Sequence, residues 1–120
     1  MKKVELPPIG ATVWVMTEHF YYIPEKAAPR REFTVCPGYV SRHNISPARE
    51  PEVVISYRDA DGFQCLTFVR RSCLKDGCFE TPRAAAEKAR KMTELAESRS
   101  LERFFGEKMR RPWKKYLMEE

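Results

Sequence analysis

The sequence lacks most of the residue patterns that catalysis requires. It has only two histidines, His19 and His43, and neither is accompanied by a serine or cysteine motif that predicts a catalytic triad. Its five glycines are scattered, so no glycine-rich loop is present to hold a phosphate group. The carboxylate pair Asp59 and Asp61 is explained by a turn. We therefore expect a protein that is not an enzyme and that binds no cofactor.

The four cysteines do not predict a metal site. Cys73 and Cys78 stand too far apart for a zinc-binding CxxC pair, and neither histidine has a metal-ligand spacing to any cysteine. In a reducing compartment, thiols are more often buried apolar groups than disulfides. We expect that role for all four, which include Cys36 and Cys65.

Long apolar runs and a strong excess of one charge are also missing. No segment approaches the roughly 20 apolar residues of a membrane-spanning helix. Pro7 and Pro8 follow the basic N-terminus, where a signal peptide would be apolar. The expected location is therefore the cytoplasm, without a membrane partner. The formal net charge of +5 is compatible with an anionic partner but does not indicate one by itself.

The sequence does contain short runs of β-branched and aromatic residues between turn residues. Thr12–Met16 predicts a first strand, and later runs predict strands at Glu32–Cys36 and Tyr39–Ser41. The Pro37-Gly38 pair between the last two predicts a bulge or corner, which curls small sheets towards closure. Two proline-bounded segments, residues 19–31 and Asn44–Pro51, are expected to be surface loops.

The clearest prediction in the sheet is a β-hairpin. Val53–Arg58 and Phe63–Val69 are its strands, and Asp59–Gly62 is its turn. In that turn, Gly62 can supply the positive φ that other residues avoid.

A helix is predicted to begin at Thr81, which can cap its N-terminus, with Pro82 at the first helical position. The apolar stripe that should dock on the sheet consists of Ala85, Ala89, Met92 and Ala96. A second stripe follows out of phase and consists of Leu101, Phe104, Phe105 and Met109. On a straight helix it would lie nearly opposite the first stripe.

Two structures explain this change of phase. The helix breaks at Ser98-Arg99-Ser100 and a second short helix folds back, or one long helix projects with its distal half facing something else, such as a second copy of the chain. We favour the break. Together, the patterns predict a single α+β domain over residues 1–120. It has a small curled antiparallel sheet of about five strands in 8–80, a packing helix in 81–97, and a second helix with a basic-aromatic tail in 98–120.

Two short motifs frame this arrangement. Gly10–Val15 matches a Gly-x-x-Val-Trp/Tyr opening, and Phe79–Ala85 matches a closing Phe-x-Thr-x-x-x-Ala segment that enters a helix. Over residues 8–97 the sequence resembles small uncharacterised proteins from phages and mobile elements of gut Firmicutes. The resemblance implies an SH3-like barrel with a C-terminal helix. It also implies a setting in which accessory proteins include regulators and inhibitors of host defence, but it implies no catalytic residues.

Cations and aromatic residues are mixed at the C-terminus, a composition typical of nucleic-acid binding, since cations contact phosphates and aromatics stack on unpaired bases. The candidate binding residues in this tail are Lys108, Arg110, Arg111, Trp113, Lys114, Lys115 and Tyr116. The sheet contributes Tyr21, Tyr22, Arg30 and Arg31. The alternative is that the tail aromatics pack onto the body of the domain while the lysines stay solvated.

A protein partner is the other class of target. Phe20-Tyr21-Tyr22 and the second stripe, with Phe105 in it, have the aromatic character of interface anchors. Alternatively, Phe104 and Phe105 complete the core of the domain itself.

The leading functional hypothesis is a non-enzymatic binding protein of a phage or mobile element, acting on a protein or nucleoprotein target. Inhibition of a host defence complex is a concrete form of it. The first alternative is a DNA- or RNA-binding accessory protein. The second is a protein that sequesters a nucleotide signal, which would need an oligomeric pocket. A homodimer, with a second copy of the chain as partner, is a further candidate.

Overall fold

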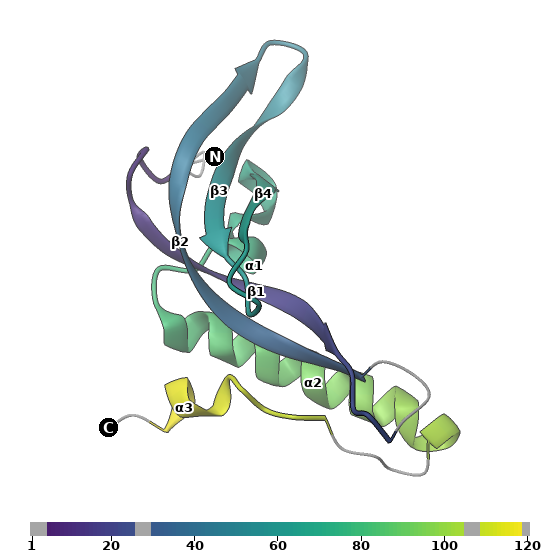
Figure 1. Ribbon diagram of the computed structural model, residues 1–120. Coiled ribbons are helices and arrows are strands. Elements are labelled where there is room, and N and C mark those ends of the chain that lie inside the picture. The colour runs from purple at the N-terminus through teal and green to yellow at the C-terminus, as the bar shows by residue number, and fades with distance from the viewer. Residues whose placement is uncertain (1–4, 26–29, 105–108, 119–120) are drawn as a thin grey trace.

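The computed structural model of the protein describes residues 5–25, 30–104 and 109–118 (Figure 1). It confirms the α+β class, with an open four-stranded antiparallel sheet whose strands follow the sequence order. The strands are β1 (Thr12–Tyr21), β2 (Arg30–Ser46), β3 (Arg49–Arg58) and β4 (Gln64–Arg70). The helical elements are the 3₁₀ turn η1 (Arg71–Cys73), α1 (Leu74–Gly77), α2 (Pro82–Phe104) and α3 (Lys114–Leu117).

The prediction of about five strands is wrong, because two of the predicted strands are one. Glu32–Cys36 and Tyr39–Ser41 both belong to β2, which continues through Pro37. Opposite Pro37, Trp14 of β1 exchanges backbone hydrogen bonds of 2.7 and 2.9 Å with Phe79, which lies at the edge of β1 away from β2. The Trp14–Pro37 pair is therefore not hydrogen-bonded, so the missing proline amide removes no bond between β1 and β2.

Strands extend into both predicted loops. β1 continues to Tyr21, which pairs with Arg30 at the start of β2. The segment Asn44–Pro51 contains the tight turn between β2 and β3, with Ser46 opposite Arg49. The resulting hairpin projects from the rest of the domain at the top of Figure 1.

The predicted bulge lies in a different place. The register of β2 against β3 shifts between Val40 and Arg42 and again beyond Asn44, not at Pro37-Gly38. Gly38 has another purpose, since a Cβ atom there would lie 2.7 Å from the carbonyl oxygen of Ser56. Only glycine therefore lets β2 and β3 approach so closely at this point.

The predicted hairpin is confirmed as β3 and β4, in which Val53 lies opposite Val69. Its turn is closed by a hydrogen bond of 2.9 Å from the Asp59 amide to the Phe63 carbonyl. Gly62 has a φ of 90°, as expected for a position that favours glycine.

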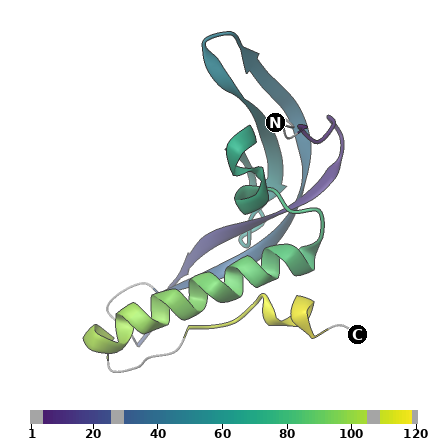
Figure 2. The ribbon, with the colours of Figure 1, turned by 180° about the vertical axis from the view of Figure 1, so that it is seen from behind.

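Each face of the sheet has its own core. The inner face carries a cluster that α1 closes, made up of Val13, Val15, Cys36, Val40, Val53, Ile55, Val69 and Leu74. The opposite, outer face is covered only over β1 and β2, where α2 packs (Figure 2). Its buried residues are Phe33, Ala86, Ala89, Ala96 and Trp113.

The start of α2 is confirmed, but its predicted break is wrong. The Thr81 hydroxyl accepts a hydrogen bond of 3.1 Å from the Ala84 amide, and Pro82 is the first helical residue. The predicted stripe docks on the sheet, with Ala85 and Ala89 fully buried. The helix then continues through residues 98–100. Serine costs a helix only about 0.5 kcal/mol relative to alanine, too little to end a helix that is already docked.

The cysteines are all free thiols, but only one has the environment predicted for them. Cys36 is buried in the inner core, and Cys65 and Cys78 are half-buried. Cys73, which lies in η1, is exposed.

Candidate functional site

The C-terminal segment 109–118 returns along α2 and ends in α3, where Figure 1 shows it as the yellow trace beneath the long helix. Trp113 anchors this segment and is only 4% exposed. Its indole Nε1 donates a hydrogen bond of 3.0 Å to the hydroxyl of Thr93, which donates one of 2.8 Å to the carbonyl of Ala89. The buried polar groups are thereby satisfied, and the Trp113 ring is not exposed for stacking on a base.

The two arginines of the tail form ion pairs within the protein. Arg111 donates to both carboxylate oxygens of Glu97 at 2.8 and 2.9 Å, and Glu97 also accepts the Met109 amide at 2.8 Å. Arg110 binds Glu32 of β2 in the same bidentate way, at 2.8 and 2.9 Å. Such paired, charge-assisted hydrogen bonds are among the stronger polar contacts in proteins.

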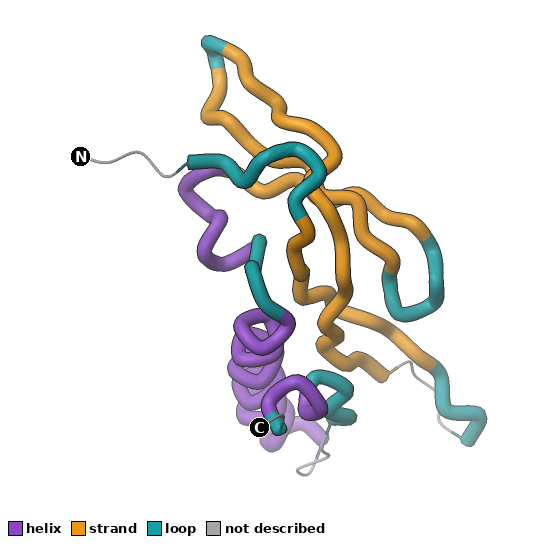
Figure 3. The backbone as a smooth tube through the Cα atoms, turned by 90° about the vertical axis from the view of Figure 1, so that its left-hand side faces the viewer, coloured by secondary structure: helices purple, strands orange, loops and turns teal. Residues whose placement is uncertain are grey.

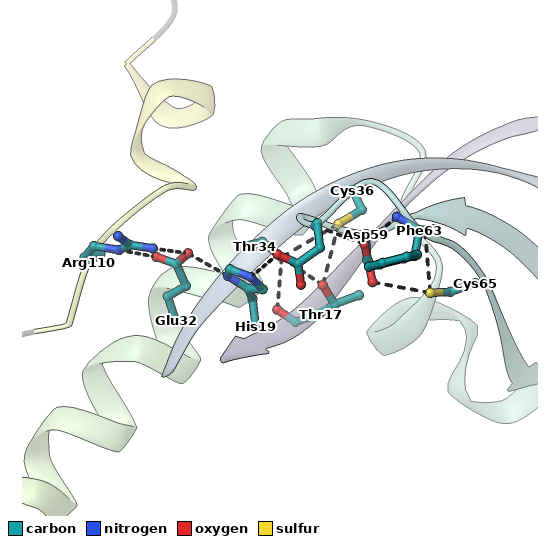
Figure 4. Close-up of polar contacts among 10 residues, drawn as sticks. Thr17, His19, Glu32, Thr34, Cys36, Asp59, Phe63, Cys65 and Arg110 are labelled. Carbon is teal, nitrogen blue, oxygen red and sulfur yellow. Dashed lines mark hydrogen bonds and ion pairs between the residues drawn. The ribbon is translucent and has the colours of Figure 1, made fainter. Parts of the chain in front are cut away.

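Glu32 is the centre of a polar cluster that joins three parts of the chain (Figure 4). Besides Arg110, it accepts a hydrogen bond of 2.9 Å from Nδ1 of His19 on β1. The other ring nitrogen of His19 lies 3.0 Å from Asp61 in the β3–β4 turn. The Arg110 guanidinium also lies over the ring of Tyr21, 3.5 Å from its centroid. The cluster therefore ties the tail and β1 directly to Glu32, and it ties the β3–β4 turn to Glu32 through His19.

The electrostatics of this cluster favour its charged form. The hydrogen bond to Glu32 is the largest cause that raises the pKa of His19, and burial opposes it only in part. Burial alone would raise the pKa of Glu32, but the hydrogen bonds from Arg110 and His19 outweigh it and lower that pKa. Both ring nitrogens of His19 face carboxylates, so both contacts are satisfied as donors only when the ring is protonated.

Among the described residues, the hydrogen bonds of the His19 ring go to carboxylates and not to a hydroxyl or a thiol. The next pair along β1 and β2 is Thr17 and Thr34, whose hydroxyls are 2.8 Å apart, and the buried thiol of Cys36 lies beyond them. Within residues 5–25, 30–104 and 109–118, no three His, Cys, Asp or Glu side chains are grouped so that they could hold a metal ion. The contacts of the cluster cross-link β1, β2, the β3–β4 turn and the tail.

The other predicted binding residues are spread over two regions. Tyr22 is exposed at the end of β1, Arg30 is half-buried, and Arg31 pairs with Glu18 at 3.1 Å. In the tail, Lys114 and Lys115 are exposed, whereas Tyr116 packs edge-on against Trp14 with ring centroids 5.9 Å apart. Phe105 and Lys108 lie outside the described residues.

An apolar patch on the outer face was not predicted. It consists of Tyr39, Leu66 and Phe68, which are 50%, 54% and 52% exposed. Tyr39 and Leu66 both lie opposite Ser56, on either side of β3, so the patch crosses three strands. The signal in the sequence is the run 64–70, where apolar residues occupy both faces of a strand and the only charge is Arg70.

The patch lies where the outer face has no helical cover. In Figure 3, the β3–β4 hairpin and α2 lie on opposite sides of the view. Exposed apolar side chains in contiguous groups mark interaction surfaces more often than scattered ones do. The patch is therefore the described surface that best fits a binding site.

Comparison of the chain with protein-family models, with curated proteins and with solved structures found no match. Among the described residues, no helix is both long enough and apolar enough to cross a membrane.

Proposed function

We propose that the chain is a non-enzymatic binding protein that acts on a protein or nucleoprotein target through the apolar patch. The exposure of Tyr39, Leu66 and Phe68 carries this proposal, because burying such side chains contributes about 25 cal/mol per Å² of apolar surface. Aromatic residues are also enriched at the centres of protein interfaces.

The state of the tail cations supports a protein target over a nucleic acid. Arg110 and Arg111, two of the cations that favoured nucleic acid, make bidentate ion pairs with Glu32 and Glu97. A cation that is already neutralised gains less from a phosphate, because it must first give up its own carboxylate. We also propose that the chain is related to the phage and mobile-element proteins it resembles and to their SH3-like barrels. The concrete function that we propose is inhibition of a host defence complex.

The test is an affinity pull-down from a gut Firmicutes host, with and without nuclease treatment, followed by mass spectrometry. The patch variant carries Leu66→Ser and Phe68→Ser, and the control carries Lys114→Ala and Lys115→Ala. We expect a stoichiometric protein that survives nuclease, that the control retains and that the patch variant loses. Recovery that nuclease abolishes, or that the patch variant leaves unchanged, would contradict the proposal.

Direct binding of DNA or RNA is the second candidate, and one observation favours it. Arg58 and Lys115 line a cleft of about 200 Å³ between the β3–β4 turn and the tail, and Lys114 lies beside it in α3. None of these three cations has an acidic partner among the described residues. Nucleic-acid binding there would weaken steeply with salt as phosphate counterions return. It would also be lost in the Lys114→Ala/Lys115→Ala variant.

A further inference from the structure

Three stretches of strand edge lie near other parts of the chain, and they differ in what covers them. The outer edge of β1 is paired with Phe79 at Trp14. The first part of β2, which precedes the residues that pair with β3, has one edge facing the tail. Its residues Thr34–Pro37 line the same narrow cleft as Pro112 and Tyr116. Among the described residues, the edge of β4 is not paired, and the cleft beside it, which Cys73, Asp76 and Gly77 also line, is larger. Within the described residues, β4 makes backbone ladder bonds to β3 alone.

The position of β1 keeps the β4 edge open. A cleft of about 410 Å³ separates Val15–Thr17 of β1 from Thr67–Arg70 of β4, so the two edge strands do not close on each other. An unpaired edge presents a row of amides and carbonyls that can pair with another strand.

The direction of these amides follows from the turn. The Asp59 amide bonds to the Phe63 carbonyl, so Phe63 and every second residue after it face β3. The residues between them, which include Leu66 and Phe68, point their amides and carbonyls away from the sheet. These are the same residues whose side chains form the apolar patch.

The β4 edge also lacks the usual protection against pairing. Natural edge strands are blocked by proline, by lysine or by inward-facing charges. In β4, from Gln64 to Arg70, none of these is present, and the one charge stands at the end of the strand.

An antiparallel pair of two β4 strands is self-complementary. With a two-fold axis at Thr67, Leu66 lies opposite Phe68 of the other copy, and Gln64 opposite Arg70. All four of these residues point their backbone groups outward, so each pair exchanges two hydrogen bonds. The register also pairs apolar with apolar side chains on the outer face and places no like charges opposite each other.

We propose that β4 pairs antiparallel with β4 of a second copy of the chain, joining two sheets into one of eight strands and two apolar patches into one continuous surface. This goes beyond the proposed function, because it can be tested on the purified protein without any target. A single surface with two-fold symmetry would suit a target that is itself symmetric or repeated.

Sedimentation of the purified full chain over about 1 μM to 1 mM tests the dimer. The matched variants are Leu66→Ala and Leu66→Pro, which both shorten the side chain, whereas only proline removes the outward amide. We expect a concentration-dependent dimer that Leu66→Ala weakens severalfold and Leu66→Pro abolishes, with thermal unfolding temperatures of the two variants within a few degrees of each other. A wild-type chain that stays monomeric throughout overturns the proposal.

A disulfide trap keeps the proposal falsifiable if the proline variant misfolds. Thr67→Cys places two thiols on the axis at a pair whose Cα atoms are about 4.5 Å apart, within disulfide reach. Gln64→Cys is the control, because its two copies would lie about 20 Å apart along the strands. Both are made with Cys65→Ser and Cys73→Ser, so that no native thiol of this region competes.

Mild oxidation should cross-link the Thr67→Cys chain into a dimer and leave the Gln64→Cys chain monomeric. Equal cross-linking of the two cysteine variants, or cross-linking of neither variant, overturns the proposed register. These experiments also distinguish a failure of the dimer from a failure of the proposed function. If the dimer is absent while the target is still lost only by the patch variant, this inference alone fails.

Discussion

The two halves of the outer face have the same kind of side chains and opposite surroundings. Over β1 and β2, Phe33 is buried under α2 and the returning tail. Over β3 and β4, Leu66 and Phe68 remain more than half exposed. The covered half therefore stabilises the fold through its apolar residues, whereas we propose that Leu66 and Phe68 of the bare half serve to bind a partner. Substitutions in the two halves should separate stability from binding.

The largest expected effect is on the covered half. Trp113→Ala removes the buried indole and leaves the Thr93 hydroxyl without its donor. We expect a loss of about 3–5 kcal/mol in the free energy of unfolding, the usual range for truncating a large buried aromatic side chain. Urea denaturation followed by circular dichroism measures it. A loss below about 1 kcal/mol would show that the tail does not belong to the core.

The polar cluster at the end of β1 and β2 should have the next largest effect. Glu32→Gln removes the charge that holds Arg110 and His19, and we expect a loss of about 2 kcal/mol, in the range for hydrogen bonds to charged groups. Glu18→Gln is the matched control, because its pair with Arg31 is exposed and is expected to contribute less than about 0.5 kcal/mol. Equal losses from the two variants would contradict the central position of Glu32.

The same cluster predicts how stability depends on pH. The pKa of His19 is raised in the folded state, so its contribution is complete below its unfolded value of 6.5 and is lost as pH rises through the folded pKa. The pKa of Glu32 is lowered, so its contribution is present above 4.5 and is lost as pH falls through the folded pKa. Stability should therefore be greatest between the two.

Urea titrations across this range test the pH profile. His19→Gln should remove the decline on the alkaline side while leaving the acidic one. An alkaline decline of unchanged size in that variant would assign it to another group.

The smallest expected effect is on the bare half. Phe68→Ser should change the free energy of unfolding by less than about 1 kcal/mol, because the side chain is already half in water. The same variant should lose the target and weaken the dimer. A loss of stability comparable to that of Trp113→Ala would show that the patch is part of the core, and the comparison between the two halves would fail.

The features that could be predicted from the sequence are those determined by neighbouring residues. The Asp-Gly turn of the hairpin and the Thr81-Pro82 helix start depend on local backbone geometry, and both are confirmed. Period-two alternation in Val53–Arg58 puts Val53 and Ile55 on one face of the strand, and both are buried in the inner core.

The features that were missed depend on distant parts of the chain. Whether Pro37 ends a strand depends on which side of β2 its missing amide faces, and the pairing partner decides that. The role of Arg110 depends on Glu32, which lies far away in the sequence, and no local pattern relates the two. The exposure of Leu66 and Phe68 depends on where α2 docks, so composition alone could not separate them from core residues.

The length of β2 has a consequence for how the protein opens. Its first part pairs with β1 and its second part with β3, and the two ladders overlap at Gly38 and Tyr39. Successive amides of a strand face opposite neighbours, so the Gly38 amide faces β1 and the Tyr39 amide faces β3. Exchange of these two adjacent amides with solvent deuterium should therefore report separately on the opening of the two ladders. A substitution that fills Gly38 should speed exchange on the β3 side, because a Cβ atom there would lie 2.7 Å from the carbonyl oxygen of Ser56.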